Sequence, residues 1–393
     1  MSGPLHLAWR YMVHFRVKTA ILVASITLIA FLPAGLNVLI GESAAQLTSR
    51  AEATPLLAGA RGSPLELVLS SLYFGAETPA TSSWAEAIRV SDSGLAEAIP
   101  LYVRFRARTQ PIVGTSLEYF DFRGLRLAAG RAMALLGECV VGSRAAERLD
   151  VGPGDTVISS PESVFDLAGV YPLKMRVAGV LAPSYGPDDE AVFVDVKTAW
   201  VIEGLGHGHR DLAAPGADRA VLARDGNRIT ANASVIQYNE ITPENVASFH
   251  FHDDPASYPL TAFIAVPRDA RSGVILRGRY EGGEERMQIV QPIDVMNELL
   301  DTVLTVRSYV VAAMGTVAFA TLATAGLMFM LSLRLRRREI ETIVKIGGSR
   351  LGVATVLASE VVVVLVLGVA LAALLTALAS RFGSDAIRAF LLS

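Results

Sequence analysis

Long apolar segments lie near both ends of the chain, while the middle alternates apolar and polar positions as a soluble domain does. Residues 20–40, 309–333 and 351–378 are each long enough to cross a bilayer, which takes about 20 apolar residues. Pro33 interrupts the first segment, but neighbouring helices can accommodate it. The segment also exceeds the apolar region of a signal peptide, roughly 7–15 residues, which favours an uncleaved anchor. The pattern predicts an α-helical membrane part with three spans.

Positive charge beside the apolar segments indicates their orientation. Three basic residues precede residue 20, and six lie between residues 334 and 350. Because cytoplasmic loops carry an excess of Lys and Arg, both regions are predicted to be cytoplasmic. The predicted organisation is a cytoplasmic N-terminus at 1–19, a transmembrane helix at 20–40, an outer domain at 41–305, a second transmembrane helix at 309–333, a cytoplasmic segment at 334–350, a third transmembrane helix at 351–378 and a short outer tail at 379–393.

The segment between the first two spans predicts a large mixed α/β domain. Residues 101–108 alternate apolar and charged side chains, as an antiparallel strand with one solvated face does. A short apolar strand at 138–141 precedes a predicted helix at 143–149, and a Gly- and Pro-rich turn follows that helix. The further predicted strands are 156–159, 175–181, 191–196 and 260–266.

Helical stalks are predicted at both ends of this domain. Residues 41–60 can continue the first span, and residues 291–308 place their apolar positions on one helical stripe. Residues 182–190 are predicted to form a polar loop that joins two strands. Residues 204–220 and 222–258 hold most of the Gly, Asp, Asn and His, which predicts loops or an inserted subdomain. Two stalks that enter and leave the membrane would tie the domain mechanically to the spans.

Composition supports a membrane protein and narrows its chemistry. Hydrophobic residues make up 52% of the chain, mean hydropathy is +0.42, and a net charge of −3 gives no basic field for nucleic acid. The one cysteine, Cys139, excludes an internal disulfide and is predicted to be a core residue. No P-loop, H-E-x-x-H or G-x-S-x-G motif occurs, so we expect no enzymatic activity here and ATP hydrolysis in a separate subunit.

Four of the six histidines form two H-x-H motifs in the polar part of the domain. In a strand, side chains at i and i+2 point to the same face, so each pair can chelate one ion. Imidazole and carboxylate groups bind zinc and copper. Two interpretations stay open: solvated polar loop residues, or a metal site. The candidate ligands are His207, His209, His250, His252, Asp253 and Asp254.

Glu360 is an ionisable residue inside the third predicted span. Such groups are costly in a bilayer and are candidates for function. One interpretation is that Glu360 reaches the cytoplasmic interface and pairs with a nearby arginine. The other is that it packs the span against a partner helix.

Two segments resemble the MacB/FtsX-type permease family of ABC transporters. Residues 140–196 contain VVGSRAAERLDVGPGDTVISS and then KMRVAGVLAPSYGPDDEAVFVDV, which is similar to the periplasmic core domain of that family. Residues 333–360, LRLRRREIETIVKIGGSRLGVATVLASE, are similar to its cytoplasmic coupling segment. The resemblance implies a multi-pass protein of the bacterial inner membrane with its large domain in the periplasm. Family members usually carry a fourth span, which these 393 residues lack.

The coupling segment also has a pattern of its own. Apolar side chains and a glycine recur at i, i+3, i+4 and i+7, which predicts a short amphipathic helix beside an arginine run. Such a helix can insert into a groove on a cytoplasmic partner, while the alternative is a basic loop with no partner. The residues assigned to ATPase coupling are Arg336, Arg337, Arg338, Glu339, Ile340, Ile343, Val344, Gly347 and Gly348.

The resemblance implies a permease subunit that transmits ATPase-driven motion to the periplasmic domain and exports or extracts a lipid, lipoprotein or peptide. The implied partners are a cytoplasmic ABC ATPase that binds ATP and magnesium, a second copy of this chain, membrane lipid, and a periplasmic adaptor or lipoprotein. One alternative is an FtsX-like regulator of a periplasmic hydrolase. Another is a zinc-linked periplasmic-binding membrane protein.

Overall fold

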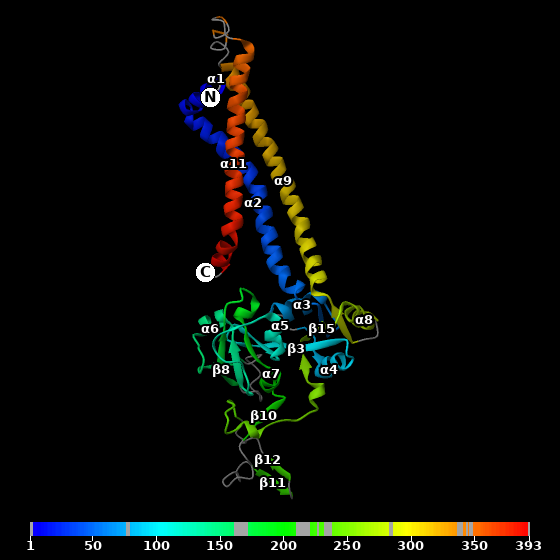
Figure 1. Cartoon of the computed structure of the whole chain (residues 1–393). Helices are drawn as coiled ribbons and strands as arrows, with labels where there is room; N and C mark the ends of the chain where they lie inside the picture. Colours follow the sequence, from blue (N-terminus) through cyan, green and yellow to red (C-terminus); the bar gives the residue numbers. More distant parts are fainter. Residues whose placement is uncertain are drawn as a thin grey trace. The chain divides into compact units, whose positions relative to one another are not determined.

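The structure is a computed structural model of the whole chain (Figure 1). It describes residues 3–75, 79–160, 172–209, 221–225, 228–231, 238–282, 286–335, 341–342, 345 and 349–391. The chain forms two compact units. Unit 1 comprises Met1–Ser49 and Glu298–Ser393, and unit 2 comprises Arg50–Asn297.

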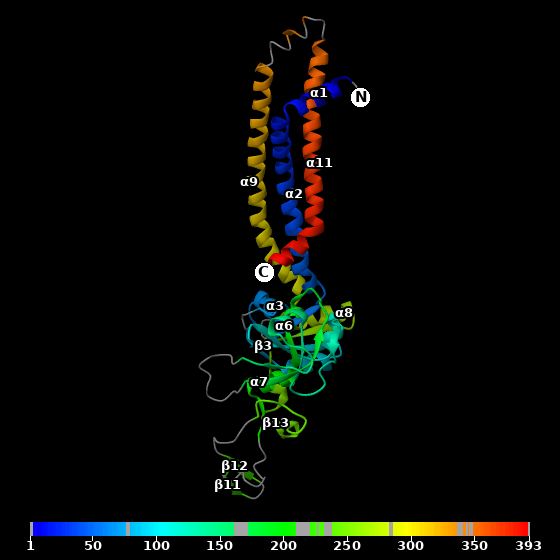
Figure 2. The ribbon, with the colours of Figure 1, turned by 90° about the vertical axis from the view of Figure 1, so that its left-hand side faces the viewer.

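Unit 1 is helical. Three long helices lie alongside one another in both views (Figures 1 and 2). A glycine allows close packing of two of them, because a Cβ atom on Gly368 would lie 2.6 Å from Cγ2 of Ile26. The hydroxyl of Thr27 also donates a hydrogen bond to the Gly368 carbonyl, at 3.2 Å. The helices of this unit are α1 (Gly3–His14), α2 (Arg16–Glu52), α9 (Pro292–Leu335) and α11 (Arg350–Leu391).

Two described helical stretches are long and apolar enough to cross a membrane, as judged by length and composition. They are Thr19–Val38, with a mean hydropathy of 2.2, and Ala358–Arg381, with a mean hydropathy of 3.0. Both overlap spans predicted from sequence. Within α9, the apolar stretch Val311–Thr324 is shorter than a bilayer needs. The predicted span at 309–333 therefore stays a prediction.

Unit 2 is built on a ten-stranded mixed sheet. Its order is β16-β1-β15-β3-β4-β9-β6-β8-β5, with β7 beside β8. The long strand β3 joins two halves, because its first half pairs with β15 and its second half pairs with β4. The strands are β1 (Leu56–Ala60), β3 (Ala96–Ala107), β4 (Gln110–Thr115), β5 (Leu127–Gly130), β6 (Glu138–Val141), β7 (Thr156–Ile158), β8 (Lys174–Leu181), β9 (Val192–Asp195), β15 (Ala262–Pro267) and β16 (Met287–Val290).

Short helices cover this sheet, and three of them, α3, α7 and α8, begin at a side-chain cap. The Asp195 carboxylate accepts a hydrogen bond from the Lys197 amide, and the Asp269 carboxylate accepts one from the Ser272 amide. Figure 1 shows α4 and α8 beside the β15 half and α6 beside the β8 half. The helices are α3 (Pro64–Leu72), α4 (Trp84–Asp92), α5 (Glu118–Arg123), α6 (Ser143–Leu149), α7 (Val196–Glu203) and α8 (Ala270–Tyr280).

The two long helices that continue into unit 1 join unit 2 at neighbouring strands. Helix α2 is followed by β1, and β16 is followed by α9. Strands β1 and β16 pair antiparallel, with Leu57 opposite Val290 and Ala60 opposite Met287. The start of β1 and the end of β16 therefore lie at the same end of one hydrogen-bonded pair.

Most elements predicted for unit 2 are confirmed, with boundary shifts of a few residues. The strands at 101–108, 138–141, 156–159, 175–181, 191–196 and 260–266 and the helix at 143–149 are present. Cys139 is fully buried, as expected of a core residue.

The predicted helical stalk at 41–60 is wrong in its second half. The helix ends at Glu52, and Leu56–Ala60 forms a buried strand between β15 and β16. Leu and Ala favour helices, but pairing on both edges and burial override that preference. The polar stretch 204–258 was predicted as loops or a subdomain, and its described residues hold four short strands. These are β10 (Gly206–Gly208), β11 (Val221–Asp225), β12 (Arg228–Ala231) and β13 (Phe249–Phe251).

Candidate functional site

A buried ionic cluster inside unit 2 includes Arg50, which lies in the last turn of α2. The guanidinium of Arg50 binds both carboxylate oxygens of Asp188, and its Nη2 donates to the Tyr119 hydroxyl at 2.6 Å. The Tyr119 hydroxyl donates in turn to Oδ1 of Asp188, at 2.7 Å. The side chains of Arg50 and Asp188 are only 9% and 4% exposed. We call Arg50, Tyr119 and Asp188 the Arg50 cluster.

Further contacts extend the Arg50 cluster along the end of α2. The Arg50 guanidinium lies 5.3 Å from the centre of the Phe74 ring, within the range of a cation–π contact. Arg123, the last residue of α5, donates to the Thr54 hydroxyl at 2.9 Å, and that hydroxyl donates to the Arg50 carbonyl at 2.8 Å. Helix α5 and the chain that leaves α2 are therefore connected through side chains as well as through the sheet.

The segment that carries Asp188 is held rigidly in place. Asp188 belongs to a short 3₁₀ helix, Pro187–Glu190, and the neighbouring Asp189 carboxylate accepts hydrogen bonds from the amides of Ser184 and Tyr185. A Cβ atom on Gly142 would lie 2.2 Å from the Asp188 carbonyl oxygen, so only glycine fits there. Within the segment predicted as a polar loop, Asp188 and Asp189 are thus buried and hydrogen-bonded.

Charge complementarity stabilises the ionised forms in the Arg50 cluster. Burial by itself would raise the pKa of Asp188, but the Arg50 charge and the hydrogen bonds from Arg50 and Tyr119 lower it overall. The pKa of Tyr119 is raised, chiefly by burial, so the phenol stays protonated and can donate to the carboxylate. The cluster is an internally neutralised ion pair with a hydrogen-bond donor beside it.

Sequence reasoning missed the Arg50 cluster. Its members lie 69 and 138 residues apart, so no local spacing connects them. The one available signal was an arginine at the end of an apolar helix with a run of carboxylates elsewhere in the domain. That signal does not say which carboxylate is buried.

The residues assigned to ATPase coupling lie outside the described residues. These are Arg336, Arg337, Arg338, Glu339, Ile340, Ile343, Val344, Gly347 and Gly348. Their role stays a prediction.

Glu360 is described, and it is buried in unit 1 at 7% exposure. It lines a groove of about 840 Å³ together with His14 and Arg16, which lie at the junction of α1 and α2. The basic residues of this lining, His14 and Arg16, lie just before the apolar stretch Thr19–Val38. The predicted pairing of Glu360 with an arginine stays a prediction.

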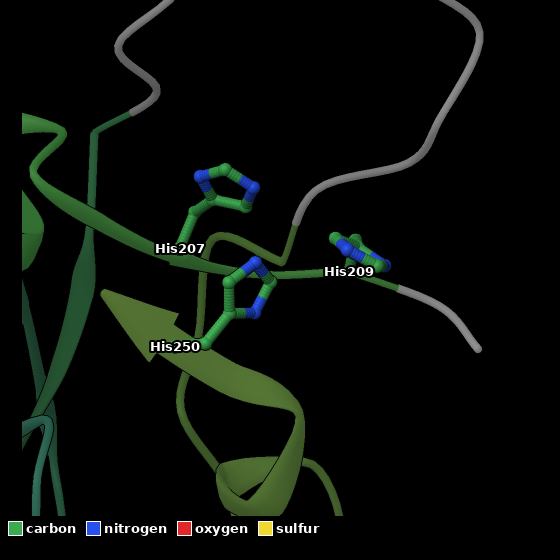
Figure 3. Close-up of side chains that lie close together, drawn as sticks. All are labelled: His207, His209 and His250. Atoms are coloured by element: carbon green, nitrogen blue, oxygen red, sulfur yellow. The ribbon is translucent and has the colours of Figure 1, made fainter. Parts of the chain in front are cut away.

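The structure brings the two H-x-H motifs together. Three ring nitrogens, one from each of His207, His209 and His250, lie within 4.8 Å of one another. Figure 3 shows these three side chains. His252 joins them, because its Nε2 lies 3.4 Å from Nε2 of His207. Asp253 and Asp254 are exposed and do not belong to this group of potential ligands among the described residues. Asp254 instead accepts a hydrogen bond from the Ala256 amide and caps a 3₁₀ turn.

Comparison with known protein families gives a match over more than half of the chain. The family described as MacB-like periplasmic core domain matches residues 20–237, more than half of the chain. Among solved structures, the periplasmic region of MacB from Actinobacillus actinomycetemcomitans matches at 12% identity and a TM-score of 0.36, over 63% of this chain and 92% of that one.

Two further structures match at similar levels. The extracellular domain of the noncanonic ABC-type transporter YknZ from Gram-positive bacteria has 13% identity and a TM-score of 0.32, over 60% of this chain and 99% of that one. A domain of a putative permease protein from Porphyromonas gingivalis has 11% identity and a TM-score of 0.26, over 60% of this chain and 86% of that one. No curated protein sequence matches this chain. On the family match, this chain belongs to the MacB/FtsX-type permease family and carries its MacB-like periplasmic core domain.

Proposed function

We propose that this chain is the membrane subunit of an ABC transporter and that it carries ATPase-driven motion from the cytoplasm to its periplasmic domain. Membership of the permease family supports the class of protein. The proposed driver is a separate ABC ATPase that binds ATP and magnesium, since the sequence contains no P-loop. The proposed cargo is a lipid, lipoprotein or peptide in the bacterial periplasm or at the inner membrane.

The attachment of the long helices to unit 2 is the observation that carries this proposal. Helices α2 and α9 continue directly into β1 and β16, which are hydrogen-bonded neighbours. Both connections therefore act on the same edge pair of the sheet. A displacement shared by the two helices would move that pair as one body, while a displacement that separated them would strain its ladder of hydrogen bonds.

The Arg50 cluster makes the α2 connection stiff. A helix joined to a sheet by backbone alone can swivel at the residues between Glu52 and Leu56. Here the buried bidentate pair of Arg50 with Asp188 ties the last helical turn to a segment next to β9, in the other half of the sheet. Movement of α2 would thus reach both halves of unit 2.

The cytoplasmic end of the proposed path is the segment at 334–350. Its apolar positions would enter a groove on the ATPase, and its arginines would lie at the membrane surface. We propose that two copies of the chain act together, because two ATPase subunits close on each other around ATP.

The test is purification of the full-length chain from its native membrane in mild detergent, followed by identification of the proteins that remain bound. We expect a P-loop ATPase in stoichiometric amount. Replacement of Ile343 and Val344 by Asp should abolish its retention, since charge on the apolar stripe prevents insertion into a groove. A matched pair, Arg10→Gln with Arg16→Gln, alters the other predicted cytoplasmic segment and should retain the ATPase. Absence of any ATPase from the wild-type complex would exclude the proposal.

A further inference from the structure

Four histidines share one face of a two-stranded ribbon in unit 2. Strands β10 and β13 pair antiparallel, and His207 lies directly opposite His250. Side chains on a strand alternate between faces, so His209 and His252, two residues further along, lie on the same face as His207 and His250. The register of this ribbon thus joins two motifs that are more than 40 residues apart in the sequence.

The opposite face of the ribbon is apolar and packs onto the domain. Gly206 and Gly208 make room for the rings of Phe251 and Phe249, because a Cβ atom on either glycine would lie within 2.6 Å of a ring atom. Both phenylalanines pack against the hydrophobic core, and Phe251 contacts the Tyr258 ring at 5.8 Å. Packing therefore fixes which way the ribbon faces and turns the imidazoles away from the core.

Two of the imidazole nitrogens are spaced as ligands of one tetrahedral ion, and the other rings lie close by. With Zn–N bonds of about 2.0–2.1 Å, two nitrogens of a tetrahedral site lie about 3.4 Å apart. Nε2 of His207 and Nε2 of His252 lie 3.4 Å apart. The centres of the His207 and His250 rings are 4.9 Å apart, and those of His209 and His250 are 5.2 Å apart. Figure 3 shows His207, His209 and His250 converging from the two strands.

A hydrogen bond to the backbone orients the His250 ring. Nδ1 of His250 lies 3.0 Å from the Ser248 carbonyl oxygen. Donation of the Nδ1 proton to this carbonyl leaves Nε2 as the nitrogen with the free lone pair, the arrangement that metal-ligating histidines have.

Burial and the neighbouring imidazoles favour the neutral form of His207. The pKa of His207 is lowered, first by burial and then by the neighbouring imidazoles of His252, His250 and His209. Neutral imidazole is the form that coordinates a metal. In the group formed by His207, His209 and His250, the potential donors are ring nitrogens.

We propose that His207, His209, His250 and His252 bind one zinc ion on the outer face of the β10–β13 ribbon. Nitrogen donors at tetrahedral spacing suit zinc, whereas calcium and magnesium require oxygen donors. The ion would bridge the two strands of the ribbon. Zinc binding is a property of unit 2 in addition to the proposed transport role, and neither depends on the other.

The test uses the full-length chain in detergent, purified through an affinity tag that contains no histidine and stripped of metal with a chelator. Titration with zinc against a competing chromophoric chelator should show one equivalent bound per chain. Replacement of His207 and His250 by Ala should weaken binding by roughly 100-fold or more, since loss of even an outer-shell partner costs about 10–100-fold.

The sequence offers a matched control, because its two remaining histidines are His6 and His14. The pair His6→Ala with His14→Ala removes the same number of imidazoles and should leave the zinc affinity unchanged. Cobalt substitution gives an independent readout: a tetrahedral site produces intense visible absorption that the His207→Ala, His250→Ala protein should lack. Zinc binding that is absent from the wild type, or equally strong in the His207→Ala, His250→Ala protein, would overturn the proposal.

Discussion

The Arg50 cluster and the histidine ribbon are two polar groupings in one domain, and they balance charge in opposite ways. In the Arg50 cluster, a cation meets an anion and a hydrogen-bond donor, and all three are buried. On the ribbon, four imidazoles lie close to one another. The Arg50 cluster pairs a cation with an anion inside the chain, whereas the ribbon gathers potential ligands for a cation. We therefore propose a mechanical role for the cluster and a binding role for the ribbon.

The largest expected effect is loss of the buried ion pair. Asp188→Ala leaves the Arg50 charge buried without its partner and should lower the free energy of unfolding by roughly 3–5 kcal/mol. Chemical denaturation of the full chain, followed by the fluorescence of Trp84 and Trp200, measures this change.

An exposed ion pair in the same segment gives the control for Asp188→Ala. Glu190 pairs with Arg148 at 3.0 Å, with both side chains more than a third exposed. Glu190→Ala should therefore cost less than about 1 kcal/mol. Equal losses from the two substitutions would remove the special role given to the Arg50 cluster.

Zinc should stabilise the ribbon and leave the Arg50 cluster unaffected. At a free zinc concentration 100 times the dissociation constant, binding to the folded form adds about 2.7 kcal/mol. Limited proteolysis around residues 204–258 should slow when zinc is added. In Asp188→Ala, the same zinc-dependent protection should appear, since distant sites contribute independently. A zinc-dependent gain in stability that differed between Asp188→Ala and the wild type would show that the two groupings are coupled.

Substitution of Gly142 tests how closely the Asp188 segment is packed. Gly142→Ala places a methyl group against the Asp188 backbone and should cost about 1–3 kcal/mol, through displacement of the 3₁₀ helix. Gly62→Ala is the matched control, because a Cβ atom there meets no other atom within 4 Å. Thermal unfolding of both variants measures the difference. Unchanged stability in Gly142→Ala would mean that the Asp188 segment is not held tightly.

The smallest effect is a change in acid stability. The pKa of Asp188 is lowered in the folded chain from an ordinary value of 3.8. The ionised pair therefore contributes stability above about pH 3.8, and this contribution is lost as the pH falls through the lowered pKa. The stability difference between the wild type and Asp188→Asn should be constant at higher pH and shrink in that acid range. A difference that began to shrink near neutral pH would point to another titrating group.

Local patterns predicted the elements of unit 2 well and its long-range contacts poorly. The alternation at 101–108 correctly indicated a strand, although its polar face is only partly exposed, at Arg104 and Arg106. Leu56–Ala60 was taken for a helix, because its residues are helix formers and only its neighbours in the sheet make it a strand.

The Arg50 cluster and the histidine ribbon also differ in how far the sequence predicts them. The spacing of the H-x-H motifs is a local signal, so the candidate ligands could be named from the sequence, while the register that joins the two motifs could not. Arg50 and Asp188 carry no local signal, since what makes them special is burial against each other. Sequence patterns thus show which side chains can act together, and the fold determines which do.

The central claim is that motion from the ATPase reaches unit 2 through α2 and α9. A spin label at an introduced cysteine in place of the exposed Asn297 can follow this motion, because the native Cys139 is buried and burial raises its pKa to about 12. Distances between labels in the two protomers of the purified complex would be compared without nucleotide and with trapped ATP. We predict a shift in the distance distribution that shrinks in Asp188→Ala. Identical distributions in both states of an ATPase-active complex would contradict the account.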